Sequence, residues 1–250
     1  MKDRRAFLPI DQTDLRERGW GSCDVVLVTG DAYVDHPAYG AAVIGRVLEN
    51  AGFKVGILAQ PDWASSSDFL KLGRPRLFFG ITAGNLDSMV SNFTASKKPR
   101  RSDDYSPGGQ GGRRPDRATL VYANKIKELF PGIPVVLGGV EASLRRLAHF
   151  DHWAEDVRRS ILLDAKADIL VYGMGETQIV EIARRLRDGE DVKRLPPVRG
   201  TAILRNSLEG YEDAVKIPSF EEVRGNKDKF NGAFRLHYAE NDPVRGRTVA

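Results

Sequence analysis

Asp24-Val25-Val26-Leu27-Val28-Thr29 is apolar without alternation, which is typical of a strand buried on both faces of a parallel sheet. Gly30 and Asp31 follow it as a turn, and residues 41–50 then repeat apolar side chains at helical spacing. A strand, a glycine turn and a helix in this order are typical of an α/β fold. The rest of the sequence repeats this unit.

Further strands and helices alternate along the chain. Apolar runs that predict strands lie at residues 54–59, 76–81, 134–139 and 168–173. Predicted helices lie at residues 116–130, 141–150 and 176–188. The alternation predicts an α/β fold with a doubly wound, mostly parallel, Rossmann-like sheet.

The character of the sequence changes near residue 190. Residues 191–250 contain Pro196, Pro197 and Pro218 and show little helix or strand signal before Phe230. We therefore expect one domain over residues 1–190 and a C-terminal extension over residues 191–250.

The composition excludes several classes of protein. A chain of 250 residues can bury a core without disulfides or metals. Its single cysteine, Cys23, rules out a disulfide framework and an iron–sulfur cluster held by this chain alone. The sequence shows neither a signal peptide nor a run of about 18 apolar residues, so we expect a cytoplasmic protein without membrane spans.

The net charge of +4 is concentrated in one segment. Residues 96–117 contain several prolines and the cluster Gly108-Gly109-Gln110-Gly111-Gly112 without periodicity, which predicts a long loop that is functional or disordered. The remaining charges sum to zero, so a diffuse basic surface for nucleic acid is not expected. The candidate polyanion contacts in this loop are Lys97, Lys98, Arg100, Arg101, Arg113, Arg114 and Arg117.

Glycine turns that carry acidic or amide side chains end several of the predicted strands. Parallel strands end at one edge of a sheet, so these turns predict a ligand crevice at that edge. Tight strand-to-helix turns would by themselves explain any single one of these glycines. The candidate crevice residues are Asp31, Tyr33, Asp35, His36, Asn85, Gly138, Gly139, Glu141, Gly175 and Glu176.

Two common phosphate-binding motifs are absent from this edge. Gly173-Met174-Gly175-Glu176-Thr177-Gln178 lacks the third glycine of the dinucleotide fingerprint and places an acid where a pyrophosphate would sit. The sequence also has no Gly-Lys-Ser or Gly-Lys-Thr of a Walker loop. Ordinary nicotinamide and nucleoside-triphosphate chemistry are therefore disfavoured.

Asp35 and His36 in the first loop allow two interpretations. Asp35 could orient His36, and either residue could act as a general base or a ligand. Alternatively, one of them caps a helix that begins near Pro37. A hydrolase that uses Asp31, Asp35 and His36 is a minor hypothesis, which loss of turnover in His36→Ala would support.

Three other reactive side chains favour structural roles. His149 and His152 are three residues apart and would share one face of a helix. Without a third ligand at a recognisable spacing, they are expected to be solvated polar residues rather than a metal site. Cys23 is expected to be a small core residue before the first strand.

Long runs of the sequence are characteristic of one protein family. They include Val28-Thr29-Gly30-Asp31-Ala32-Tyr33-Val34-Asp35-His36-Pro37, Gly138-Gly139-Val140-Glu141-Ala142-Ser143-Leu144-Arg145-Arg146 and Val171-Tyr172-Gly173-Met174-Gly175-Glu176. These and further runs across essentially the whole chain resemble the YgiQ family of radical S-adenosylmethionine (SAM) proteins.

The resemblance implies the N-terminal region of a longer protein. In that family a Rossmann-like domain precedes a radical SAM barrel, where a Cys-x-x-x-Cys-x-x-Cys motif holds a 4Fe-4S cluster that works with S-adenosylmethionine. The motif is absent from these 250 residues, so its cysteines are expected beyond Ala250. The implied partner is the C-terminal radical SAM domain of the same protein.

The strand ends also resemble cobalamin-binding domains that precede such barrels. Their histidine-ligand motif is Asp-x-His-x-x-Gly, whereas Asp35 here is adjacent to His36 and Gly40 lies one place too far. This departure argues against histidine-ligated cobalamin and leaves cobalamin bound through backbone contacts open.

Together these features predict an accessory domain of a radical SAM enzyme with an unassigned substrate. Its crevice would line the site of a substrate or corrinoid, and this chain alone is not expected to be catalytic. The alternative is a non-catalytic module that binds RNA or another polyanion through residues 97–117. Only Tyr105 offers a stacking surface in that loop.

Overall fold

The structure is a computed structural model, which describes residues 7–242 and 244–250. It divides into two compact units. The first runs up to Arg146 and also contains Ile161–Ile203, and the second contains Leu147–Ser160 and Leu204–Ala250. The division does not fall at the expected boundary of residue 190. The first unit carries the sheet and the candidate site.

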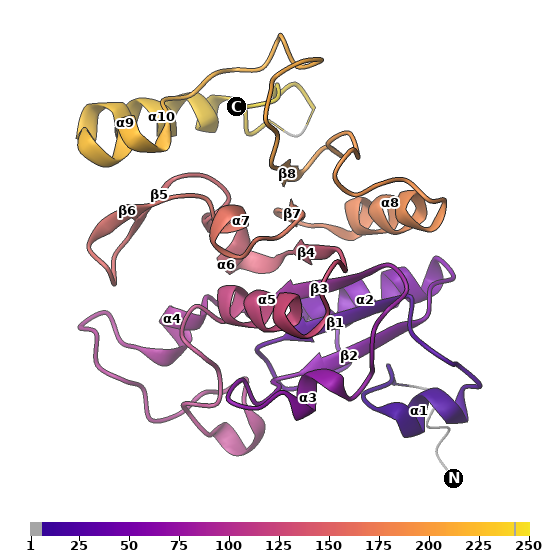
Figure 1. The fold of residues 1–250 in the computed structure, drawn as a ribbon. Coiled ribbons are helices and arrows are strands. Elements are labelled where there is room, and N and C mark those ends of the chain that lie inside the picture. Colours follow the sequence, from indigo (N-terminus) through magenta and orange to yellow (C-terminus); the bar gives the residue numbers. More distant parts are fainter. Residues whose placement is uncertain (1–6, 243) are drawn as a thin grey trace. The chain divides into compact units, whose positions relative to one another are not determined.

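Six strands form the sheet of the first unit (Figure 1). They are β1 (Val25–Thr29), β2 (Val55–Ala59), β3 (Phe78–Thr82), β4 (Val135–Leu137), β7 (Ile169–Val171) and β8 (Thr201–Ile203). Their order across the sheet is β2-β1-β3-β4-β7-β8, and only the edge strand β8 runs antiparallel to its neighbour. The chain moves outward from β1 to β2 and then crosses to β3 on the other side, which confirms the doubly wound α/β fold.

Helices cover both faces of this sheet. They are α1 (Gln12–Glu17), α2 (Gly40–Asn50), α3 (Ser67–Leu70), α4 (Ser88–Asn92), α5 (Ala118–Leu129), α6 (Gly139–Leu144), α7 (Ile161–Asp164) and α8 (Glu176–Arg187). α2 and α8 pack against each other on one face, together with Leu27 and Val136 of the strands. α5 packs on the other face, where its Tyr122 joins Phe79 of β3.

The unbroken apolar run of β1 follows from this two-sided cover. All five of its side chains are buried, with Val26 and Val28 in one layer and Val25 and Leu27 in the other. Each aliphatic side chain removed from water contributes about 1.5–3 kcal/mol, so the strand is held from both faces. The carboxyl end of β1 is thereby held in a fixed position among the carboxyl ends of the neighbouring strands.

The second unit contains a hairpin and the C-terminal helices. β5 (His149–Asp151) pairs antiparallel with β6 (Asp156–Arg158), and α9 (Phe220–Gly225) and α10 (Lys227–Ala239) follow later in the chain. Arg224 of α9 forms an ion pair with Asp156 of β6 at 2.7 Å.

The predicted helix over residues 141–150 is correct only in its first part. α6 ends at Leu144, and the chain then turns into the β5–β6 hairpin. His149 therefore lies in a strand and His152 in the turn after it, so the two histidines do not share a helix face. No helix in the described part of the chain combines the length and apolar character that a bilayer span requires.

Candidate functional site

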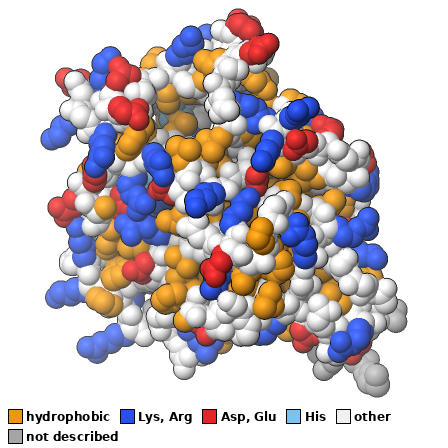
Figure 2. Space-filling view, viewed as in Figure 1, with side chains coloured by type: hydrophobic (Ala, Val, Ile, Leu, Met, Phe, Trp, Pro, Cys, Tyr) orange, Lys and Arg blue, Asp and Glu red, His pale blue; other side chains and the backbone are white. Residues whose placement is uncertain are grey.

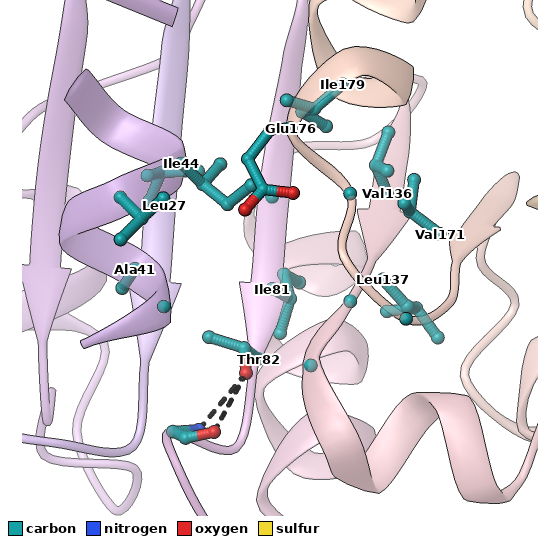
Figure 3. A pocket seen from close by; sticks show the side chains of 18 of the residues that line it. Leu27, Ala41, Ile44, Ile81, Thr82, Val136, Leu137, Val171, Glu176 and Ile179 are labelled. Atoms are coloured by element: carbon teal, nitrogen blue, oxygen red, sulfur yellow. Dashed lines mark hydrogen bonds between the residues drawn. The ribbon is translucent and has the colours of Figure 1, made fainter. Parts of the chain in front are cut away.

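A cavity of about 330 Å³ opens at the carboxyl ends of the parallel strands. It lies between the sheet and helices α2 and α8, beside the point between β1 and β3 where the strand order reverses (Figure 3). Open α/β sheets bind their ligands at this point. The cavity is lined mainly by aliphatic side chains, which include Leu27, Ile44, Ile81, Val136, Leu137, Val171 and Ile179.

Glycines form much of the remaining lining. Three of them are needed by the backbone, since Gly84, Gly139 and Gly173 have φ of 111°, 80° and 72°. A Cβ atom at Gly175 would approach Val171 Cγ1 to 2.6 Å, so packing requires that glycine. The structure thus brings Gly138, Gly139 and Gly175 of the predicted crevice into one cavity lining, and their part in binding stays a prediction.

Glu176 supplies the charge of this lining. It begins α8 and is half-buried, and its carboxylate forms no hydrogen bond or ion pair with another described residue. Figure 3 shows its carboxylate extending from α8 over the cavity, between Ile44 of α2 and Val136 of β4. An ionised carboxylate only accepts hydrogen bonds, so a bound molecule must offer donors at this point.

Asp31 belongs to a buried ion network rather than to the cavity lining. Its Oδ1 lies 2.9 Å from Arg114 Nη1, and Arg114 Nη2 lies 2.9 Å from Asp103 Oδ2. Arg114 also donates to the carbonyl of Ala83 at 2.7 Å, and Asp31 Oδ2 accepts the Asn85 N–H at 2.7 Å. The network ties the ends of β1 and β3 to the loop that follows α4. The prediction of Arg114 as a polyanion contact is wrong, because its guanidinium is fully buried.

Asn85 joins the cavity mouth to the β3 turn. Its Nδ2 donates to the carbonyl of Ala38 at 2.9 Å, and its Oδ1 accepts the N–H of Gly40 at 3.2 Å. Ala38 and Gly40 both line the cavity. Asn85 therefore positions the beginning of α2 at the mouth without lining it.

Glu141 has a structural role away from the cavity. Its buried carboxylate accepts hydrogen bonds from Ser88 N (2.8 Å), Ser88 Oγ (2.5 Å) and Thr119 N (3.0 Å). These donors lie at the first turns of α4 and α5, so the carboxylate satisfies N–H groups that the helices leave free. The crevice role predicted for Glu141 is corrected to that of a helix anchor.

The first loop does not contain the predicted carboxylate–histidine pair. Asp35 forms an ion pair with Arg46 of α2, while the exposed His36 accepts the Ala38 N–H at Nδ1, 3.1 Å away. Neither residue caps α2, which begins at Gly40 without a side-chain cap. Tyr33 accepts the Leu8 N–H through its hydroxyl at 2.9 Å, and burial raises the pKa of that hydroxyl. Tyr33, Asp35 and His36 therefore shape the loop and do not line the cavity.

Residues 96–117 form a long loop with short elements of local structure. It contains the short helix η2 (Pro107–Gly109) and isolated bridges between Phe93 and Pro99 and between Ser102 and Gln110. Tyr105 O accepts the Ala32 N–H at 2.8 Å, which attaches the loop to the end of β1.

Most of the basic side chains of this loop remain at the surface. Arg100 donates to the carbonyls of Val90 and Phe93, and Arg117 is half-buried. On the face shown in Figure 2, Lys and Arg side chains are dispersed among hydrophobic and acidic ones. Polyanion binding stays a prediction for the exposed group of Lys97, Lys98, Arg100, Arg101 and Arg113.

Metal and thiol chemistry find little support in the described residues. They contain no cluster of three or more His, Cys, Asp or Glu side chains that could hold a metal ion. Cys23 is buried, and desolvation together with Asp24 raises the pKa of its thiol to about 12. The thiol is therefore neutral at physiological pH, as expected for a core cysteine.

The apolar lining of the cavity was not predicted from the sequence. Ile44, Val136 and Ile179 have the periodicity of ordinary core residues. One signal was available in the buried run Phe78-Phe79-Gly80-Ile81, because a glycine inside a strand often marks a close approach by another group. Gly80 faces the cavity.

Comparisons with known proteins support one family. The family model described as "Radical SAM N-terminal" matches residues 7–250. A UPF0313 protein of Clostridium perfringens is 56% identical over 244 residues, which cover 97% of this chain and 37% of that protein. A UPF0313 protein of Thermotoga neapolitana is 55% identical over 239 residues, which cover 96% of this chain and 42% of that protein. The chain thus spans about two fifths of the length of these relatives.

One solved structure is similar in part. It is the radical S-adenosylmethionine methyltransferase TsrM from Kitasatospora setae, with tryptophan and a SAM analogue bound. The match has 21% identity and a TM-score of 0.47, and it covers 73% of this chain and 28% of that one.

Proposed function

This chain belongs to the radical SAM N-terminal family, and from that premise we propose that it is the accessory domain of a radical S-adenosylmethionine enzyme. In this proposal the strand-end cavity lines the chamber in which a substrate or a corrinoid reacts. The cluster that cleaves S-adenosylmethionine is held by the part of the protein outside this chain.

The observation that carries the proposal is the apolar surface around the cavity. The segments that directly follow β1, β3, β4 and β7 each contain an exposed large apolar side chain, and these are Val34 (41% exposed), Leu86 (40%), Val140 at the beginning of α6 (41%) and Met174 (86%). Exposed apolar groups gathered on adjacent turns are typical of a surface that another domain covers. The greater length of the relatives supports the rest of the same protein as that domain.

The residues of this chain do not fit the iron–sulfur cluster that the family implies. The sequence has one cysteine, Cys23, and its thiol is buried and neutral. A histidine-ligated corrinoid is also not supported, because His36 does not line the cavity and its Nδ1 accepts the Ala38 N–H. No chemical step is therefore assigned to this chain.

The contribution of this chain is to enclose and orient the bound molecule. The aliphatic lining excludes water, which protects a radical from side reactions. Glu176 fixes the orientation by accepting hydrogen bonds from donors on the ligand. The ion network of Arg114 keeps the surrounding turns in place.

The test is anaerobic reconstitution of the whole protein with iron and sulfide. We expect a three-cysteine motif after residue 250, the absorption spectrum of a 4Fe-4S cluster, and cleavage of S-adenosylmethionine to 5′-deoxyadenosine. Absence of that motif from the whole protein, or failure of the reconstituted protein to cleave S-adenosylmethionine, would contradict the proposal.

A further inference from the structure

We propose that the cavity binds a purine nucleoside, with the base in the apolar slot and the ribose hydroxyls donating to Glu176. This inference rests on the proposed function, since it names the class of molecule that the accessory domain holds.

The floor of the cavity is an aliphatic surface on the central strands. Leu27, Gly80 and Val136 lie in one row across β1, β3 and β4, on the face that α2 and α8 cover. Gly80 has no side chain, and a Cβ atom there would meet Leu27 Cδ2 at 2.8 Å, so the Leu27 side chain packs over the middle of this row. Branched side chains surround this floor (Figure 3). A planar ring can lie on such a floor with aliphatic contacts at its edges and upper face.

The size of the slot limits what can enter. About 330 Å³ is at the lower end of the range of about 300–1,000 Å³ that small-molecule sites occupy. It suits a fused ring with a sugar and is too small for a dinucleotide. The walls provide no polar side chain beyond Thr82 and Glu176 among the lining residues. The aliphatic walls therefore contact the faces of the ring, and the polar atoms at its edge must be met by backbone groups of the lining or by water.

The mouth contains two glycines that the chain itself does not require. A Cβ atom at Gly40 would meet nothing within 4 Å, and one at Gly138 would meet only the Val171 carbonyl, at 3.8 Å. Gly138 has an extended backbone with φ of −157°, and Gly40 is not in the left-handed region. Neither backbone conformation nor internal packing explains these glycines. The space that their side chains would occupy is the entrance, where a ligand can contact the backbone.

The charges at the mouth favour a neutral group that both donates and accepts hydrogen bonds. The Glu176 carboxylate has no partner among the described residues and repels a phosphate. α8 begins there without a side-chain cap, so its first N–H groups are available to an acceptor, whereas the Gly40 N–H of α2 already donates to Asn85 Oδ1. The dipoles of both helices repel a cation. A ribose satisfies both demands, because its hydroxyls donate to the carboxylate and its oxygens accept from N–H groups. Acidic side chains at strand ends bind ribose hydroxyls in other α/β folds.

The test is isothermal titration of the purified protein with adenosine. We expect saturable binding to one site and about tenfold weaker binding of 2′-deoxyadenosine, because one hydrogen bond to a charged group is lost. Glu176→Ala should weaken adenosine binding about tenfold and remove the preference over 2′-deoxyadenosine. Glu181→Ala is the matched control on the same helix, since Glu181 pairs with Arg185 and does not line the cavity.

A second pair of variants tests the entrance. Gly138→Val places a branched side chain in the mouth and should weaken adenosine binding more than about tenfold, by steric exclusion from the site. Gly21→Val introduces the same side chain at a position where a Cβ meets nothing within 4 Å and which lies outside the lining. It should bind adenosine as the wild type does. Thermal unfolding of each variant shows that the fold is retained.

Three results would overturn the inference. They are no adenosine binding by the wild type, equal affinity for adenosine and 2′-deoxyadenosine, and binding that survives both Gly138→Val and Glu176→Ala. Cleavage of S-adenosylmethionine by the whole protein is measured separately. If that cleavage occurs without adenosine binding at this site, the nucleoside assignment fails while the proposed function stands. If adenosine binds at this site but the whole protein forms no cluster, the proposed function fails while the nucleoside assignment stands.

Discussion

At the scale of single residues, the polar side chains near the cavity are mostly used to hold the fold. Arg114 is the clearest case, because a fully buried guanidinium lies between Asp31 and Asp103. A buried charge is tolerated only with such partners. Removal of the arginine would leave two carboxylates without their counter-ion in the interior.

Arg114→Met should therefore destabilise the protein by about 3–5 kcal/mol, the usual cost of removing one partner of a buried ion pair. Urea unfolding followed by circular dichroism measures the change. Arg113→Met is the matched control, because Arg113 is exposed and should change stability by less than about 0.5 kcal/mol. Equal effects of the two substitutions would show that the network does not stabilise the fold.

Cys23 provides a second prediction for one residue. The raised pKa of its thiol, about 12, keeps the reactive thiolate scarce at pH 8, and burial blocks access. The native protein should resist iodoacetamide at pH 8, whereas the protein in denaturing urea should be alkylated once. Intact-mass spectrometry distinguishes the two. Rapid alkylation of the native protein would contradict the buried position.

At the scale of elements, Glu141 connects three helices. It belongs to α6 and accepts hydrogen bonds at the beginnings of α4 and α5. Glu141→Gln should destabilise the protein by about 1–3 kcal/mol, because an amide group would point a donor at these N–H groups. Glu128→Gln on the exposed side of α5 is the control, with an expected effect below about 0.5 kcal/mol. Chemical unfolding of both variants tests the difference, and a neutral Glu141→Gln would refute the anchoring role.

The elements also show how far the sequence could be used for prediction. β1, β2 and β3 were predictable because a two-sided core imposes unbroken apolar runs on them. The β5–β6 hairpin was missed, since residues 145–150 carry no turn signal strong enough to stop a helical pattern. The sheet edge of the site was predictable from glycine turns. The residues that line the site were not predictable, because contacts between distant segments determine them. Such contacts make Asp31 and Glu141 anchors of the fold and leave Ile44 and Gly80 at the cavity.

At the scale of the whole molecule, the exposed apolar turns at the strand ends are the surface that the proposed function assigns to the rest of the protein. Met174 is 86% exposed, so Met174→Asp should leave the melting temperature of the 250-residue chain almost unchanged. In the whole protein the same change should impair cleavage of S-adenosylmethionine, since a charge would be buried at the domain contact.

The control for Met174→Asp is a similar change elsewhere in the first unit. Ile10 is 47% exposed and follows Pro9, whose carbonyl accepts the Ile57 N–H at the outer edge of β2. Ile10→Asp should leave cleavage unchanged in the whole protein. Equal activity of the Met174→Asp and wild-type proteins would argue against docking at the strand ends.

The position of Gly80 has a kinetic consequence. β3 is hydrogen-bonded to β1 on one side and β4 on the other, so the part of the cavity floor that contains Gly80 belongs to the middle of a continuous sheet. A cavity with such a floor keeps its shape when no ligand is bound. A ligand can therefore enter without a prior rearrangement of the sheet. Entry rates should then be similar for all molecules of the right shape. Differences in affinity among these molecules should therefore come from differences in their dissociation rates.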